Sequence, residues 1–157
     1  DGSMVRGHIG AAAVLYHEGR EISEAKKYVG NNREHEVYEA EVIGLLLGLE
    51  LLAREQGVTA ATFFIDNQAV LSTLQAGTTN NIGYFFEQLD EVIRLVRDRN
   101  RGVKLEAHWI PGHTGVKGNE RVDKSAKQAA DREQLTDETL PLSLRGEIPI
   151  NPTAAKR

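Results

Sequence analysis

The chain has 157 residues, 40% hydrophobic and 27% charged, which is typical of a globular domain and excludes a disordered or collagen-like chain. It contains no cysteine, so disulfides and thiolate metal sites are excluded, and a metal ion would need carboxylates, imidazoles or backbone oxygens. The net charge of −4 argues against general adhesion to nucleic acid. No apolar run approaches the roughly 20 residues that a membrane helix needs, so no membrane partner is expected.

The first half of the chain predicts a hairpin followed by a long buried helix. Residues 10–16, GAAAVLY, and 20–29, REISEAKKYV, flank the turn HEG, a pattern typical of two antiparallel strands. From about Val37 to Gln56 the apolar positions cover nearly the whole circumference of a helix, which indicates a helix enclosed in the core. Gly57 marks its end.

The second half of the chain alternates strands with helices. Asp66 or Asn67 can cap the first of these helices. A hairpin followed by such alternation predicts an α/β fold, in which helices cover a mixed sheet. The expected elements are a strand over 61–66, helices over 67–74 and 84–99, a strand over 103–109 and a helix over 120–130.

Glu41 is unusual in the first long helix. Helical spacing places it on one stripe with Leu45, Gly48 and Leu52, so its carboxylate shares a face with buried aliphatic groups. Such a carboxylate shifts its pKa or binds a cation, and a divalent metal ion satisfies it best. A milder interpretation is stabilisation by the helix N-terminus. Gly44 and Gly48 indicate that the helix backbone closely approaches the sheet, which would bring Glu41 near the strand ends.

Further acids stand at the edges of buried elements. Asp66 ends an apolar strand, where ligands bind in open α/β sheets, although simple capping of the next helix is the alternative. Asp123 borders the apolar face of the last helix, with a salt bridge to Lys127 as its alternative. Together with Asp1 and Glu41, these acids suit two octahedral, oxygen-ligated ions such as Mg²⁺.

Residues 111–123, PGHTGVKGNERVD, place a single histidine in a glycine-rich loop that leads into the last helix. Taken alone, His113 fits an ordinary surface residue better than a functional one. Basic residues gather between Arg94 and Lys104, where solvated helix faces and phosphate contacts are equally good explanations.

Five segments follow one another in an order that is more informative than any of them alone. They are DGS at 1–3, GAAAVLY at 10–16, AEVIGLLLGLELL at 40–52, FFIDNQAVL at 63–71 and HWIPGHTGVKGNERVDKSAKQAA at 108–130. Together they resemble a type 1 ribonuclease H domain. The resemblance implies an RNase H-like α/β fold over residues 1–131, with a mixed five-stranded sheet of an antiparallel hairpin plus parallel strands, flanked by helices on both faces. Residues 132–157 are expected to form a polar, proline-containing C-terminal tail that lies on the surface or is disordered.

The resemblance also implies the site residues. It makes His113 a mobile-loop histidine that assists proton transfer or product departure. Two Mg²⁺ ions, or Mn²⁺ in their place, would be bound, with Asp1 contacting both. The four metal-binding carboxylates would be Asp1, Glu41, Asp66 and Asp123.

The implied activity is hydrolysis of the RNA strand of an RNA–DNA hybrid, leaving 5′-phosphate and 3′-hydroxyl ends by a two-metal-ion mechanism. RNA is distinguished by its 2′-hydroxyls in a wide minor groove. The basic run from Arg97 to Lys104 is a candidate for contacts with the DNA strand. Substrate contacts to the RNA are implied for Gly2, Ser3, Asn67 and Gln68.

Within this family the chain looks more similar to domains of retroelement reverse transcriptases than to free-standing bacterial enzymes, because it lacks their basic protrusion between the second and last major helices. This implies a reverse transcriptase polymerase domain as a linked or associated partner, and weak hybrid binding by the isolated domain. An intracellular location, nuclear or cytoplasmic, is expected, with no targeting segment visible. The first strand of the family starts before Asp1, so this strand is expected to be truncated here.

Three other functions remain open at the level of sequence. A non-catalytic module could bind hybrids and keep its acids for structural reasons, a polynucleotidyl transferase on the same fold could act on DNA ends, and a purely structural domain could be tethered to a polymerase. Metal-dependent cleavage of a hybrid distinguishes the nuclease from these alternatives.

Overall fold

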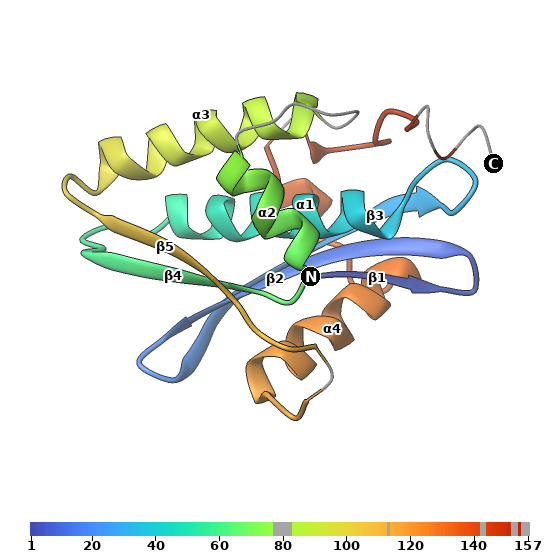
Figure 1. The fold of residues 1–157 in the computed structure, drawn as a ribbon, viewed down its shortest axis with the longest axis horizontal. Coiled ribbons are helices and arrows are strands. Elements are labelled where there is room, and N and C mark those ends of the chain that lie inside the picture. The colour runs from blue at the N-terminus through green and yellow to red at the C-terminus, as the bar shows by residue number, and fades with distance from the viewer. Residues whose placement is uncertain (77–82, 113, 142–143, 152–153, 155–157) are drawn as a thin grey trace.

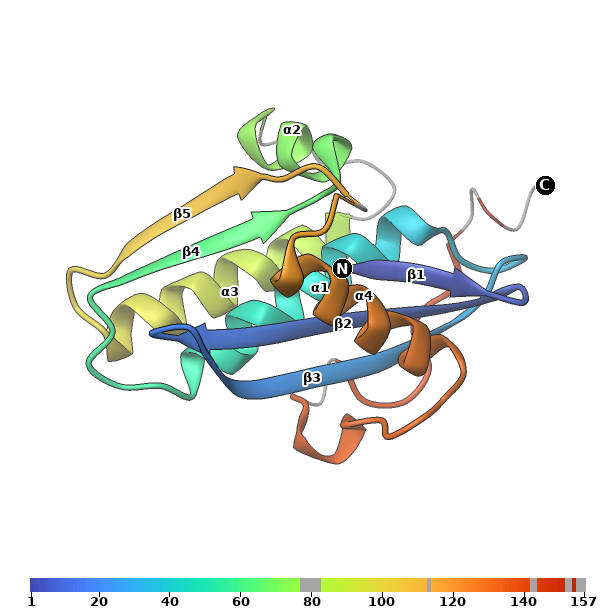
Figure 2. The same ribbon diagram turned by 90° about the horizontal axis from the view of Figure 1, so that it is seen from below.

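The computed structural model describes residues 1–76, 83–112, 114–141, 144–151 and 154. Helices α1 and α3 cover one face of the strands and α4 covers the other (Figures 1 and 2), which confirms the predicted α/β class. Among the described helices, none combines the length and the apolar character that crossing a bilayer requires. The elements are β1 Gly2–Val5, β2 His8–His17, β3 Arg20–Asn31, α1 Val37–Ala53, β4 Ala60–Ile65, α2 Gln68–Ala76, α3 Gly83–Arg99, β5 Lys104–Trp109, α4 Lys117–Ala130 and a 3₁₀ helix at Asp137–Thr139.

The five strands form two hydrogen-bonded sheets, whereas the resemblance implies one mixed sheet. Strands β1, β2 and β3 pair antiparallel, and β4 pairs parallel with β5. Strand β1 pairs with β2, and within the described residues β4 has only β5 as a ladder partner. Helix α1 connects the two sheets: a Cβ atom at Gly48 would lie 3.3 Å from Phe63 in β4 and 3.6 Å from Ala13 in β2. The close approach predicted from Gly48 is therefore confirmed.

Helix α1 forms the centre of the hydrophobic core. Its apolar side chains face β2, β4 and α3 at once, so it is buried around nearly its whole circumference, as the sequence predicts. Each fully buried Leu or Ile contributes about 2 kcal/mol through removal of apolar surface from water. The side chains that are at most 1% exposed include Ile43, Leu46, Leu47 and Leu51.

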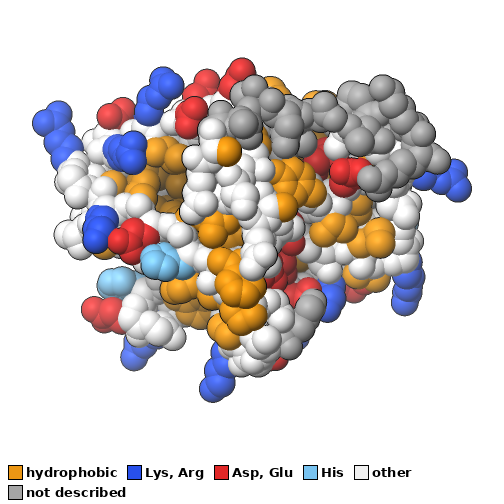
Figure 3. Space-filling view, in the orientation of Figure 1, with side chains coloured by type: hydrophobic (Ala, Val, Ile, Leu, Met, Phe, Trp, Pro, Cys, Tyr) orange, Lys and Arg blue, Asp and Glu red, His pale blue; other side chains and the backbone are white. Residues whose placement is uncertain are grey.

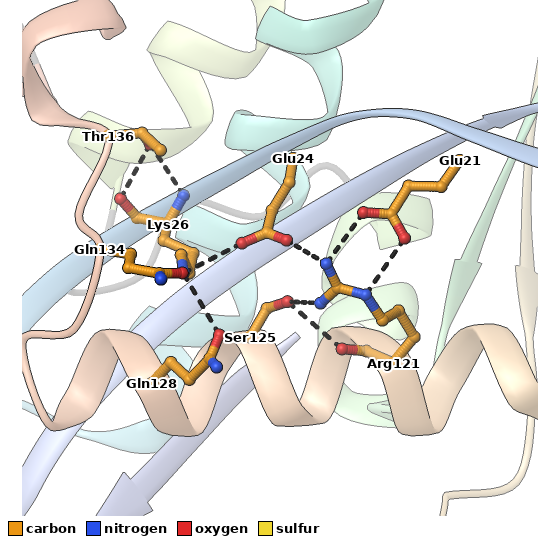
Figure 4. Close-up of polar contacts among 8 residues, drawn as sticks. All are labelled: Glu21, Glu24, Lys26, Arg121, Ser125, Gln128, Gln134 and Thr136. Atoms are coloured by element: carbon orange, nitrogen blue, oxygen red, sulfur yellow. Dashed lines mark hydrogen bonds and ion pairs between the residues drawn. The ribbon is translucent and has the colours of Figure 1, made fainter.

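Helix α4 is fixed to β3 by a charged network (Figure 4). The Arg121 guanidinium donates to both carboxylate oxygens of Glu21, at 2.8 and 3.1 Å, and also bonds to Glu24 and Ser125. Such two-pronged pairing of a planar guanidinium with a carboxylate restricts orientation as well as distance. The first two turns of α4, which carry Asn119 and Asp123, are thereby held in place against β3.

The described part of the C-terminal segment packs into the domain, although the sequence predicts a tail on the surface or in disorder. Leu140, Leu144 and Ile148 are at most 5% exposed and belong to the main core. Thr136 also exchanges backbone and hydroxyl hydrogen bonds with Lys26, at the edge of β3. Their four-residue spacing does not continue along the segment, and among its described residues the longest regular element is the 3₁₀ helix, so helical periodicity gave no signal there.

Candidate active site

Three carboxylates from separate elements lie close together. Asp1 precedes β1, Glu41 lies near the start of α1, and Asp66 directly follows β4. One oxygen atom of each lies within 4.8 Å of one oxygen atom of the other two. Acidic side chains are visible near the centre of the face in Figure 3, where Figure 1 labels the N-terminus, whereas Lys and Arg lie around its rim. The structure thus brings together three of the four acids expected to bind metal.

Backbone pairing and one glycine place Asp1 beside Glu41. The amino nitrogen of Asp1 donates to the Ala12 carbonyl at 2.9 Å, and the Ala12 N–H donates to the Asp1 carbonyl at 2.9 Å. A Cβ atom at Gly44 would lie only 2.5 Å from the Asp1 nitrogen, so a larger residue there would push α1 away. Because Gly44 follows Glu41 by about one helical turn, this approach brings the Glu41 carboxylate to Asp1.

Asp66 does not act as the helix cap that was its alternative role. The cap of α2 is Asn67, whose Oδ1 atom accepts the Val70 N–H at 3.1 Å. This hydrogen bond satisfies one of the free N–H groups at the start of the helix. The Asp66 carboxylate consequently points to the acidic cluster instead.

The structure separates Asp123, the fourth predicted metal ligand, from this cluster. The Asp123 Oδ2 atom accepts a hydrogen bond from Lys127 Nζ at 2.6 Å, which is the salt bridge anticipated as its alternative. Asp123 is absent from the group of oxygens within 4.8 Å of one another, although its charge still acts on Glu41. The predicted loop histidine, His113, lies outside the described residues.

Glu41 has the most strongly perturbed acidity of the cluster. The pKa of its carboxyl group is raised from an ordinary value of 4.5 to about 7, chiefly by burial and in addition by the charges of Asp66 and Asp123. The amino group of Asp1 and a hydrogen bond from the Gly2 N–H act in the opposite direction. A proton and a bound cation are therefore alternative ways to neutralise this carboxylate.

We expect the stability of the metal-free chain to fall as the pH rises from 4.5 to about 7, because the folded state holds a proton on Glu41 that the unfolded state has lost. At about 1.4 kcal/mol per pKa unit, the loss amounts to roughly 3 kcal/mol. Glu41→Gln should remove this pH dependence of the free energy of unfolding. The measurement is urea unfolding in EDTA at about pH 5 and about pH 8. The exposed Glu87→Gln serves as control, and a pH dependence that survives in Glu41→Gln would contradict the assignment.

The cluster fits a hard divalent cation. The Asp1 Oδ2 atom is buried and has no hydrogen-bond partner among the residues that the structure describes. In the same part of the chain, Asp1, Glu41 and Asp66 form no ion pair with Lys or Arg. Converging carboxylates that lack a basic partner need positive charge, and Mg²⁺ prefers oxygen ligands of this kind.

The predicted substrate residues border the cluster because they follow Asp1 and Asp66 in the chain. The Gly2 N–H bonds to the Glu41 carboxylate, and Ser3 is only 9% exposed. Asn67 is half-buried and Gln68 is exposed.

The basic run from Arg97 to Lys104 lies elsewhere. Arg99 donates to the Ala53 carbonyl at 2.5 Å, at the end of α1 opposite Glu41. Glu41 and Ala53 are separated by about 18 Å along the axis of α1. The predicted contact of this run with the DNA strand, which pairs with the strand bound at the acids, stays a prediction.

Two residues that contact Asp66 were not among the predicted site residues. Trp109 Nε1 donates to the Asp66 carbonyl at 3.3 Å, and Asn119 Nδ2 donates to its Oδ2 atom at 3.3 Å. A signal for Asn119 does exist in the sequence, because it precedes Asp123 by four residues and so shares its helix face.

Comparisons with known proteins agree with this site and fold. The family model described as RNase H matches residues 1–131. A ribonuclease H of Idiomarina loihiensis is 29% identical over 140 residues, covering 84% of this chain and 83% of the relative. RNase H1 of Halobacterium salinarum shares the fold, with a TM-score of 0.59 at 20% identity over 84% of this chain and 94% of that one. So does LC11-RNase H1, solved in complex with an RNA/DNA hybrid, with a TM-score of 0.63 at 19% identity over the same shares.

The family match spans most of the chain, and the solved structures have the same α/β arrangement of helices and strands. The acids that converge in the structure come from segments inside the matched region. The chain therefore belongs to the RNase H family, whose members are hydrolases that act on the RNA of RNA–DNA hybrids.

Proposed function

We propose that this chain is an endoribonuclease that hydrolyses the RNA strand of RNA–DNA hybrids and leaves 5′-phosphate and 3′-hydroxyl ends. The observation that carries the proposal is the convergence of Asp1, Glu41 and Asp66 within 4.8 Å, in a chain of the RNase H family. The hybrid bound to LC11-RNase H1, which has the same fold, supports the choice of substrate.

The acids would hold two divalent cations, Mg²⁺ or Mn²⁺. When bound, such ions lower the pKa of an attacking water and offset the charge that develops on the phosphate. Asp1, Glu41 and Asp66 supply the ligands that are already close together. Asp123 joins them when its hydrogen bond to Lys127 opens, and His113 assists proton transfer or product departure.

Selection of RNA falls to the groups beside these acids. Gly2 and Ser3 follow Asp1, and Asn67 and Gln68 follow Asp66, so these four residues are placed to contact 2′-hydroxyls. Gln68 is exposed, whereas Ser3 is only 9% exposed and offers less surface to a substrate. An RNA strand that lies across the cluster would place its scissile phosphate at the metal ligands and its sugar edges at these residues.

The direct test is cleavage of an end-labelled RNA–DNA hybrid by the purified chain under titration with Mg²⁺ and Mn²⁺. We expect cleavage of the RNA strand that requires the metal and stops with EDTA, because clustered carboxylates repel a phosphodiester, whereas a bound divalent cation offsets this charge and lowers the pKa of the attacking water. The products should carry 5′-phosphates, which labelling after phosphatase treatment detects. Binding without cleavage would support the hybrid-binding module, and processing of DNA ends would support the polynucleotidyl transferase.

The biological context of this activity is a further part of the proposal. Residues 1–131 form the catalytic domain, and the sequence QAGTTNNIG at 75–83 leads into one plain helix, α3, without a basic protrusion. We infer a relation to the domains of retroelement reverse transcriptases, with a polymerase domain as the partner that strengthens hybrid binding. Hybrids made by such a polymerase place the chain inside the cell, in the nucleus or cytoplasm.

A further inference from the structure

Asp66 is contacted by the end of β5, the loop after it and the first turn of α4, in addition to being placed by the end of β4. Trp109, the last residue of β5, bonds to its backbone carbonyl at 3.3 Å. A Cβ atom at Gly112 would lie 3.2 Å from its Oδ2 atom, so the loop backbone lies directly against the carboxylate. Asn119, in the first turn of α4, donates to the same Oδ2 atom at 3.3 Å.

Asn119 is chemically suited to orient a carboxylate that must remain available to a cation. Its side chain is uncharged, so it holds Asp66 without neutralising it, whereas the Lys127 ammonium competes with a metal for Asp123. A carboxylate offers about four lone pairs on its two oxygens, so one donated N–H leaves the others free. Hydrogen bonds of this kind hold metal ligands in position in many proteins, and their loss weakens metal binding.

Asn119 itself has little freedom to move. It is 7% exposed, and the charged network of Arg121 begins two residues later in the same helix. Asn119 and Asp123 lie four residues apart and therefore on one face of α4. The orientation of Asp66 is thus coupled to the helix that carries the fourth predicted ligand.

We propose that Asn119 is a positioning residue, which fixes the Asp66 carboxylate for a divalent cation and ties it to the same helix as Asp123. This proposal rests on the proposed function, because it assumes that the acids bind metal. It goes beyond that function, since it makes α4 responsible for the position of two predicted metal ligands, Asp66 and Asp123.

The test is direct binding of Mn²⁺, measured by titration calorimetry without nucleic acid, together with the Mg²⁺ concentration for half-maximal hybrid cleavage. Asn119→Ala should lower the Mn²⁺ affinity and raise the Mg²⁺ concentration for half-maximal cleavage, each by about tenfold or more. Asn119→Leu keeps a side chain that branches at Cγ but has no donor, and it should give the same result, which keeps the test valid if the smaller Ala side chain destabilises the helix. Thermal melting in EDTA confirms that each variant is folded.

Asn100→Ala is the matched control. Asn100 is also buried and bonds to Val58, Glu55 and Val96, but it lies at the far end of α3. It should lower the melting temperature and leave Mn²⁺ binding at the wild-type level. Wild-type Mn²⁺ affinity in both Asn119 variants, or an equal loss of affinity in Asn100→Ala, would overturn the role of Asn119 and leave the proposed function standing. A wild-type chain that binds no Mn²⁺ would overturn the proposed function together with this inference.

Discussion

Asp66→Asn is expected to abolish hybrid cleavage and, at the same time, to make the metal-free protein more stable. The variant keeps the size and shape of the side chain but removes one of the three negative charges that lie within 4.8 Å. Loss of a metal ligand should reduce kcat by at least about 10³-fold, as the removal of a major electrostatic contribution does in other hydrolytic enzymes. Without metal, the charge of Asp66 repels the buried Glu41 carboxylate, and the uncharged amide of Asn keeps an oxygen that can accept the hydrogen bond from Asn119, so the substitution should increase the melting temperature.

The opposite signs of the two effects make this test specific. A variant that was merely damaged would lose activity and stability together. Asp90→Asn provides the control, because Asp90 is exposed on α3 and lies outside the cluster of Asp1, Glu41 and Asp66. If Asp66→Asn cleaves the hybrid at the wild-type rate in Mg²⁺, Asp66 is not a metal ligand of the active site. A lower melting temperature in EDTA would instead show that its carboxylate supports the fold.

The parts of the site that the sequence predicts are those specified by local pattern. An acid in an otherwise apolar helix identifies Glu41, and an acid at the end of an apolar strand identifies Asp66. Glycines at helical spacing predict the close approach that Gly44 makes to Asp1. In each case the residue type conflicts with its surroundings, and that conflict is visible without coordinates.

Features that depend on pairing between distant segments were not predictable in the same way. Asp123 can face either the other acids or Lys127, because helical spacing permits both orientations. The choice depends on a small difference in electrostatic energy between them. The contact of Asn119 with Asp66 joins residues 53 positions apart. The division of the strands into two sheets depends on ladder partners and not on the strand sequences themselves.

The C-terminal segment shows the same limit more strongly, because its sequence is mostly polar and yet its few apolar residues complete the core. We expect removal of residues 132–157 to prevent cooperative folding. The deletion would expose the surface that Leu140, Leu144 and Ile148 cover, at about 2 kcal/mol for each of these side chains. It would also open the β3 edge at Lys26, and unpaired strand edges favour aggregation. Circular dichroism and size-exclusion chromatography of residues 1–131 measure both effects.

Lys27 makes the loss larger than apolar burial alone predicts. It is 2% exposed, and its ammonium is paired with Asp137 and bonded to the Gly146 carbonyl at 2.6 Å, both in the deleted segment. A buried charge without its partner costs several kcal/mol. The total free energy lost on deletion should therefore exceed the free energy of unfolding of a typical domain. Two point variants separate lost packing from lost chain length. Leu144→Ala should cost about 3 kcal/mol, whereas Ile150→Ala, at a position 57% exposed, should cost less than about 0.5 kcal/mol. A sharp unfolding transition near that of the full chain for residues 1–131 would show instead that the segment is dispensable.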